Sequence, residues 1–316
     1  MQIKGSRFLV IGGAGFIGSH LVDQLLEQGA ELVRVYDNFS RGNLKNLSKA
    51  TENPQCEIFS LGGDVRDRDI LAKAMQDIDG VFHLAALWLL HCVEFPRSAF
   101  HTNIEGTFNV LEACVNAKIK RLVYSSSASV YGNAESIPMT EEHPFKNETF
   151  YGATKIAGEQ MLQAMHKRYQ LNYAGLRYMN VYGSRQDYKG AYIAVILKIL
   201  DRIEKGLPPI LHGDGQQTFD FVHVKDVARA NICAMAAGAN GFYNVGTGVG
   251  TSLLALCELI LQLCESNLTI KYEPNFQNFV TNRIGCVKAA ANTLDFEANI
   301  SLESGLKELL EWKRSV

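Results

Sequence analysis

The sequence predicts an α/β fold, a doubly wound parallel sheet with a smaller mixed α/β lobe. Short apolar runs alternate along the chain with segments whose apolar residues recur every three or four positions, as expected when helices join parallel strands. A glycine-rich turn follows the first apolar run, and an aspartate ends the second. Together these three observations favour a sheet that binds a ligand at the carboxyl ends of its strands.

The first apolar run, Phe8–Ile11, stops at glycine and suits a strand that is buried on both faces. A helix is expected after it, and Gly29 stands where a left-handed residue would close that helix. The apolar residues at helical spacing are Ile17, Leu21, Val22, Leu25 and Leu26. The further expected strands are Leu32–Tyr36, a strand at Phe59, Val81–Leu84, Leu122–Tyr124 and Ala174–Leu176.

The later part of the chain, from about residue 185, mixes short strand and helix patterns without a linker that marks a boundary. We therefore expect a Rossmann-type domain over residues 1–184, to which part of 220–247 returns. Residues 185–316 are expected to form mainly the smaller lobe, folded over the carboxyl ends of the sheet strands.

The composition excludes several classes of protein. Of the 316 residues, 47% are hydrophobic and 20% charged, which is typical of a soluble globular protein. A formal net charge of -2 provides no broad positive field, so nucleic acid is not an expected partner. No apolar stretch approaches the roughly 18 to 20 residues of a membrane helix, and the start of the chain does not resemble a signal peptide. Seven cysteines without a Cys-x-x-Cys pair favour reduced thiols, no metal site and a cytoplasmic location.

The glycine-rich turn reads Gly12-Gly13-Ala14-Gly15-Phe16-Ile17-Gly18 between the first strand and the first helix. Glycines at these positions allow a tight turn, a close approach of backbone N–H groups to a pyrophosphate, and close packing of helix on strand. Asp37 ends the second strand 19 residues after Gly18, where a carboxylate binds ribose hydroxyls and repels a 2′-phosphate. The pattern predicts NAD as cofactor, although Arg41 leaves NADP open.

Tyr151 and Lys155 are four residues apart, so they lie one turn apart on the same face of a predicted helix. A tyrosine has a pKa near 10, but a fixed cation and the charged nicotinamide ring both favour its phenolate form. The pair follows the serine run 125–132 at the end of a central strand, where ligands of such sheets bind. We therefore predict a proton acceptor beside a hydride acceptor.

With these motifs assembled, the chain resembles the extended short-chain dehydrogenase/reductase family, and within it the sugar-nucleotide epimerases and dehydratases. The resemblance covers almost the whole chain. The motifs that carry it, besides those above, are Gly63-Asp64-Val65, His83-Leu84-Ala85-Ala86, Asn103-x-x-Gly-Thr, Arg177-Tyr-Met-Asn180-Val-Tyr-Gly, Gly213-Asp-Gly and Asn244-Val-Gly-Thr-Gly.

The resemblance implies roles for particular residues. Tyr151 takes the proton of the sugar 4-hydroxyl, Ser127 hydrogen-bonds the same oxygen, and Lys155 completes the catalytic set. The residues implied in NAD binding are Gly12, Gly15, Phe16, Ile17, Gly18, Asp37, Asn38, Ser40, Arg41, Asp64, Val65, Leu84, Ala85, Ala86, Asn103, Tyr151 and Lys155. Those implied in binding the nucleotide sugar are Trp88, Ser127, Asn180, Phe219 and Arg283.

Two of these substrate residues carry open questions. Phe219 stands where relatives often place an arginine on the substrate pyrophosphate, which leaves Arg283 to carry that charge alone. Trp88 stands in an apolar stretch, and it either packs in the core or lines the pocket that binds the sugar or an acyl group.

The serine run bears on which reaction is catalysed. The 4,6-dehydratases of the resemblance class carry Thr-Asp-Glu where this chain has Ser127-Ala128-Ser129, and decarboxylases need a glutamate at the place of Ser129. The run instead resembles that of 4-epimerases, with a UDP-sugar favoured as substrate. Two alternatives stay open. One is a dehydratase that eliminates across the 5,6 bond and uses His91, Cys92 or Glu94 as its acid or base, and the other is a non-catalytic NAD-binding regulator.

The resemblance also implies a homodimer joined through Phe100–Cys114 and Tyr151–Tyr169.

Overall fold

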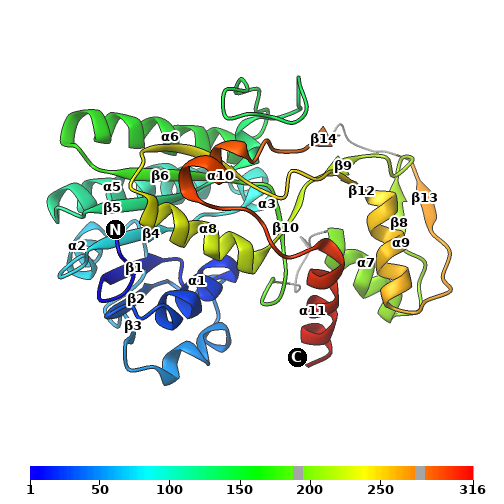
Figure 1. Ribbon diagram of the computed structural model, residues 1–316, viewed down its shortest axis with the longest axis horizontal. Coiled ribbons are helices and arrows are strands. Elements are labelled where there is room, and N and C mark those ends of the chain that lie inside the picture. The colour runs from blue at the N-terminus through cyan, green and yellow to red at the C-terminus, as the bar shows by residue number, and fades with distance from the viewer. Residues whose placement is uncertain (188–194, 275–281, 316) are drawn as a thin grey trace.

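The computed structural model describes residues 1–187, 195–274 and 282–315. Its centre is a seven-stranded parallel sheet of order β3-β2-β1-β4-β5-β6-β11 (Figure 1). The strands are β1 (Arg7–Ile11), β2 (Leu32–Tyr36), β3 (Cys56–Ile58), β4 (Gly80–His83), β5 (Arg121–Ser127), β6 (Tyr173–Tyr178) and β11 (Gly241–Val245). The strand order reverses between β1 and β4, and the carboxyl ends on either side of such a reversal form the ligand-binding edge of a Rossmann-type fold.

Both faces of the sheet are apolar, because successive side chains of a strand point to opposite faces. Phe8 and Val10 of β1 pack on one face with the helices α1 and α8, whereas Leu9 and Ile11 pack on the other with α2, α5 and α6 (Figure 1). The bounds of these helices are α1 (Phe16–Glu27), α2 (Arg68–Ala74), α5 (Gly106–Asn116), α6 (Phe150–Tyr169) and α8 (Val224–Ala237). The two layers of helices explain why the strands are continuous apolar runs.

The smaller lobe lies to one side of the sheet and has a core of its own (Figure 1). Its elements are α7 (Val195–Glu204), α9 (Leu253–Leu263), α11 (Leu302–Ser315), β8 (Ile210–His212), β9 (Thr218–Phe219), β12 (Thr251–Ser252), β13 (Lys271–Glu273) and β14 (Asn282–Arg283). These strands form a three-stranded sheet, β12-β9-β14, and the pair β13-β8. A further pair, β7 (Asn180–Tyr182) with β10 (Phe221–His223), joins the lobe to the end of β6.

Segments far along the chain return to the large sheet. Strand β11 is its last strand, α8 packs against α1, and the short helix α10 (Lys288–Leu294) packs against α8 and β11. Both α8 and β11 lie within residues 220–247, whereas α10 lies beyond them and its return was not expected from the sequence. Among the described residues, no helix is long and apolar enough to span a bilayer.

Three details differ from the sequence expectation. Strand β3 ends at Ile58, one residue before Phe59, and β4 ends at His83, before Leu84. The predicted helix over 100–114 has a π-helical first part, Phe100–Glu105, that continues into α5. The π turn contains the buried Asn103, and such turns re-aim side chains near functional sites. The other short elements are the helices α3 (Leu89–Glu94) and α4 (Pro96–Ala99) and the 3₁₀ turns Leu44–Leu47, Ala50–Glu52 and Ala128–Val130.

Candidate active site

The glycine loop forms the turn from β1 into α1 and leaves no space for side chains. Gly12 has φ of +85°, and a Cβ there would lie 2.8 Å from the backbone nitrogen of Ala85. A Cβ on Gly18 would lie 2.1 Å from the carbonyl oxygen of Gly12. Helix α1 starts at Phe16 after Gly15, with neither a side-chain cap nor an acidic residue in its first turn. Its first N–H groups, from Phe16 through Gly18, can therefore receive a pyrophosphate.

Asp37 lies at the end of β2 beside this loop. One carboxylate oxygen accepts a hydrogen bond from the Ala14 N–H at 2.9 Å, and the other accepts one from the Phe39 N–H at 2.8 Å. Burial raises the pKa of this carboxyl group, and the two N–H donors oppose that rise. Asn38 accepts a hydrogen bond from the Ser40 N–H at 3.1 Å and fixes the loop that continues to Arg41. A fixed acceptor beside an uncapped helix start fits the ribose and pyrophosphate of NAD.

Other predicted cofactor residues line the same edge of the sheet. The carbonyl oxygen of Asp64 accepts a 2.7 Å hydrogen bond from Tyr36, and Val65 is buried. The N–H groups of Leu84 and Ala85 both donate to the carbonyl of Ile11, at 2.9 and 3.1 Å. The start of the loop after β4, which continues to Ala86, is therefore tied to the end of β1.

Asn103 has a structural task that the sequence did not reveal. Its side-chain oxygen accepts a hydrogen bond from the Leu87 N–H at 2.7 Å, and its nitrogen donates to the Leu87 carbonyl at 2.8 Å. The nitrogen also donates to the hydroxyl of Thr154 on α6 at 3.2 Å. The amide therefore fixes the loop after β4 and ties it to the helix of Tyr151.

Ser127, Tyr151 and Lys155 lie close together in the structure. The hydroxyl of Tyr151 is in hydrogen-bond contact with Ser127, and the Lys155 nitrogen lies 5.6 Å from the centre of the Tyr151 ring. Lys155 is buried and donates a 2.7 Å hydrogen bond to the carbonyl of Ser125. Thr149 caps the start of α6 by accepting a hydrogen bond from the Gly152 N–H, which fixes the turn that carries Tyr151.

Burial shifts the pKa values of both ionisable groups toward their neutral forms. It raises the pKa of Tyr151 to about 12, which the Ser127 hydrogen bond and the positive charge of Arg283 oppose. It lowers the pKa of Lys155 to about 8, which Cys92 and Glu159 oppose. A lysine with a pKa near neutral pH beside a tyrosine that needs positive charge to ionise is an arrangement suited to proton transfer.

Three of the residues predicted to bind the sugar nucleotide, Asn180, Phe219 and Arg283, lie on the short strands β7, β9 and β14. Asn180 begins β7, and its N–H donates to the carbonyl of Asp220 at 2.9 Å. Arg283 of β14 lies in register with Phe219 of β9. Among the described residues, nothing hydrogen-bonds the buried Nε atom of Arg283, and burial lowers the pKa of this guanidinium to about 10. A half-buried cation whose buried Nε donor is unused is suited to an anionic ligand.

Trp88 immediately precedes α3, and its ring is in contact with the guanidinium of Arg41. The guanidinium carbon of Arg41 lies 4.6 Å from the centre of the Trp88 ring. The indole is partly exposed, so the interpretation of Trp88 as a fully packed core residue does not hold.

A family model described as the NAD dependent epimerase/dehydratase family matches residues 8–246. The chain belongs to this family. NAD is accordingly its cofactor, and the uncapped helix start and Asp37 fit that cofactor.

Three relatives show the range of this epimerase/dehydratase family. A Methanocaldococcus jannaschii protein, provisionally named a UDP-glucose 4-epimerase, is 37% identical over 97% of this chain and 98% of its own length. A UDP-N-acetyl-alpha-D-glucosaminuronate decarboxylase of Bacillus cytotoxicus is 33% identical over 98% of both chains. The solved UDP-N-acetylglucosamine 4-epimerase of Methanobrevibacter ruminantium, in complex with UDP-N-acetylmuramic acid, has a TM-score of 0.93 and 35% identity over 99% of both chains. The family therefore includes more than one reaction.

The sequence did not single out one buried ion pair of this epimerase/dehydratase chain. Glu159 lies one helical turn after Lys155, and both its oxygens accept hydrogen bonds from Arg177 of β6, at 2.9 and 2.7 Å. Ser126 donates a 2.6 Å hydrogen bond to the same carboxylate, and Arg177 also donates to the Tyr131 hydroxyl at 2.9 Å. The ion pair thus ties α6 to β6, and the Ser126 hydrogen bond ties the same carboxylate to β5 directly beside Ser127. The sequence signal that could have revealed this ion pair was the position of Glu159, which continues the four-residue spacing of Tyr151 and Lys155 on the same helix.

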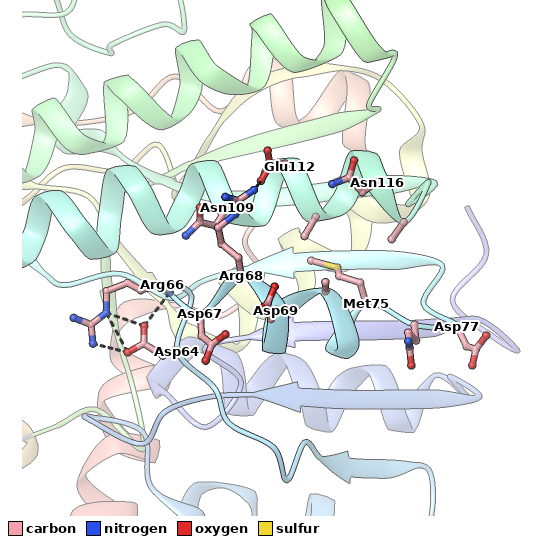
Figure 2. A pocket seen from close by; sticks show the side chains of 14 residues that line it. Asp64, Arg66, Asp67, Arg68, Asp69, Met75, Asp77, Asn109, Glu112 and Asn116 are labelled. Carbon is pink, nitrogen blue, oxygen red and sulfur yellow. Dashed lines mark hydrogen bonds and ion pairs between the residues drawn. The ribbon is translucent and has the colours of Figure 1, made fainter.

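A wide hollow of about 1210 Å³ lies elsewhere, between α2 and α5 (Figure 2). It begins at Asp64 and runs along the outside of the domain to Asp77 and Asn116. Its lining is largely charged, and the ion pair of Arg68 with Glu112 joins the two helices beside it. Neither Tyr151 nor Lys155 lines this hollow, so it is separate from the predicted catalytic set.

Proposed function

We propose that this enzyme is an NAD-dependent nucleotide-sugar 4-epimerase and that its substrate is a UDP-sugar. The serine run beside Tyr151 carries the proposal. Ala128 and Ser129 follow Ser127 at the end of β5, and both are buried. The Ser129 hydroxyl accepts a 3.1 Å hydrogen bond from Ser127. Neither position offers the acid that water loss or carbon dioxide loss would need for proton transfer.

In the proposed reaction, Tyr151 accepts the proton of the sugar 4-hydroxyl, and Ser127 hydrogen-bonds the same oxygen. NAD, when bound, takes up and returns the C4 hydride. Burial raises the pKa of Tyr151 to about 12, and the Ser127 hydrogen bond and the positive charge of Arg283 oppose that rise and favour the phenolate. Tyr151 then returns the proton after the ketone has presented its opposite face. The product differs from the substrate only at C4.

The alternative of a 5,6-elimination receives little support from Cys92, one of its three candidate groups. Cys92 is buried, its thiol donates to the Leu87 carbonyl, and burial raises its pKa to about 11. A thiol of that kind is a poor proton carrier at neutral pH. The complete set of Ser127, Tyr151 and Lys155 supports an enzyme over a non-catalytic regulator, because a sensor of NAD needs none of them.

For the nucleotide, we propose that Arg283 holds the diphosphate and that Phe219 lies beside it without binding it. The free Nε of Arg283 supports this assignment. Asn180 and Trp88 are proposed to face the sugar, and the relatives that act on UDP-sugars favour uridine as the base. The test is incubation with a panel of UDP-, dTDP-, GDP- and CDP-sugars, followed by NMR. Turnover of a dTDP-sugar alone would overturn the choice of UDP.

We also propose a cytoplasmic homodimer that pairs through residues 100–114 and 151–169. Large apolar side chains on these segments support it, because Phe100 is 45% exposed, Phe108 41% and Tyr169 55%. Light scattering at micromolar concentration should give twice the chain mass. A monomer would contradict the pairing.

For the domain division we propose residues 1–184 with part of 220–247 as the NAD-binding unit and mainly 185–316 as the substrate lobe.

A further inference from the structure

Arg41 and Trp88 form a contact between two loops that are distant in sequence. The guanidinium carbon of Arg41 lies 4.6 Å from the centre of the Trp88 ring, within the range of a cation–π interaction. The same guanidinium pairs with the carboxylate of Asp187 at 3.1 Å. Asp187 follows β7 on the way into the smaller lobe. One arginine therefore connects three segments of the chain.

The order of the strands shows what this contact crosses. Arg41 lies five residues after the end of β2, and Trp88 lies five residues after the end of β4. Both strands pair with β1, one on each side. Neighbouring strands are about 4.8 Å apart, so β2 and β4 are separated by roughly twice that distance. A contact between their loops must pass in front of the carboxyl end of β1, which is where the glycine loop 12–18 begins.

Both loops are held in place close to the contact. The amide of Asn103 binds the backbone of Leu87, the residue before Trp88, through two hydrogen bonds. Asn38 binds the N–H of Ser40, the residue before Arg41. The backbone on each side is thus fixed, and only the two side chains need to rotate to break the contact. The Arg41 side chain is 40% exposed, so such a rotation does not disturb the core.

We propose that the contact of Arg41 with Trp88 is a latch that closes over the pyrophosphate of NAD and slows its release. The glycine loop and the start of α1 bind the cofactor from one side, and the latch covers the other. A reaction that returns NAD to its starting state gains from such retention, because the cofactor need not leave between turnovers. The latch concerns the cofactor alone, and it stands whether or not the sugar reaction is a 4-epimerisation.

The experiment measures release of NAD from the holoenzyme. The enzyme is loaded with isotopically labelled NAD, diluted into excess unlabelled NAD, and sampled over time for protein-bound label. Trp88→Ala should release label about 3- to 30-fold faster than wild type, the range that the loss of one cation–π contact produces. Arg41→Gln should have a similar effect. The double variant should be no faster than the faster single variant, because both substitutions remove the same contact.

Two further variants complete the test. Trp88→Phe keeps an aromatic face and should release NAD more slowly than Trp88→Ala. Leu44→Ala changes an exposed residue of the same loop outside the contact and should match wild type. If a variant purifies without NAD, the dissociation constant measured by titration should rise by the same factor.

A wild-type release rate in both Trp88→Ala and Arg41→Gln would overturn the latch. So would additive effects of the two substitutions, because they would show independent contacts. A raised KM for the sugar nucleotide with an unchanged release rate would also overturn it and would leave Trp88 only its proposed role beside the sugar.

Discussion

The ion pair of Glu159 with Arg177 gives the sharpest prediction on stability. Both side chains are almost fully buried, with exposures of 0% and 4%. Substituting Glu159→Leu leaves the Arg177 charge buried without its counter-ion, which costs about 3–5 kcal/mol. The hydrogen bond from Ser126 is lost as well, which adds about 1 kcal/mol. We therefore expect the single variant to lose at least 3 kcal/mol of unfolding free energy.

The double variant Glu159→Leu with Arg177→Met should be much less destabilised. It removes both charges and fills the space with apolar groups, which is often close to neutral. The assay is urea unfolding of NAD-saturated protein for wild type, both single variants and the double variant. Ser126→Ala is the matched control, because it removes one hydrogen bond and keeps the ion pair, for a loss of about 1 kcal/mol. Losses that add in the double variant, or a Glu159→Leu loss below 1 kcal/mol, would refute the reasoning.

Three further predictions concern catalysis, binding and pH. Tyr151→Phe should keep the fold and the bound NAD but lower kcat by about 10²-fold or more, and a fully active variant would remove Tyr151 from the mechanism. Arg283→Ala should raise KM for the sugar nucleotide by about one to two orders of magnitude, the value of a charge-assisted hydrogen bond, and an unchanged KM would place the diphosphate elsewhere. Burial lowers the pKa of His20 from 6.5 to about 4, so the unfolded chain takes up its proton first as the pH falls. The neutral form of buried His20 therefore contributes about 3 kcal/mol of stability above pH 6.5, which should be lost as the pH falls from 6.5 to 4. Urea unfolding midpoints should fall over this pH window in wild type and fall less in His20→Gln. An equal dependence of the midpoint on pH in the two proteins would contradict the prediction.

The sequence predicted those parts of the fold and site that depend on local patterns. The glycine loop, Asp37 and the spacing of Tyr151 and Lys155 are each contained within one strand-to-helix unit. The central strands were found because continuous apolar runs mark strands buried on both faces. Their ends differed by one or a few residues, because apolar character does not mark the last paired residue. It continues past the end of β4 at Leu84, whereas β5 extends beyond its predicted apolar run through the polar residues 125–127.

Features that depend on distant pairing could not be predicted in this way. Glu159 and Arg177 are charged residues in buried positions, which apolar periodicity does not recognise. The contact of Arg41 with Trp88 requires the strand order of the sheet before it can be seen. The π turn contains Asn103, which hydrogen-bonds the loop after β4, and no local residue pattern predicts such a turn.

The measurement that tests the proposed function most directly is product analysis of the holoenzyme with a UDP-sugar. Mass spectrometry and NMR are applied to the same reaction mixture, and NAD reduction is followed by absorbance. The predicted product has the mass of the substrate, an inverted configuration at C4, and no net reduction of NAD at the end point. The absence of acids at Ala128 and Ser129 is the reason for this expectation. A product lighter by one water, or by carbon dioxide, would contradict the 4-epimerase.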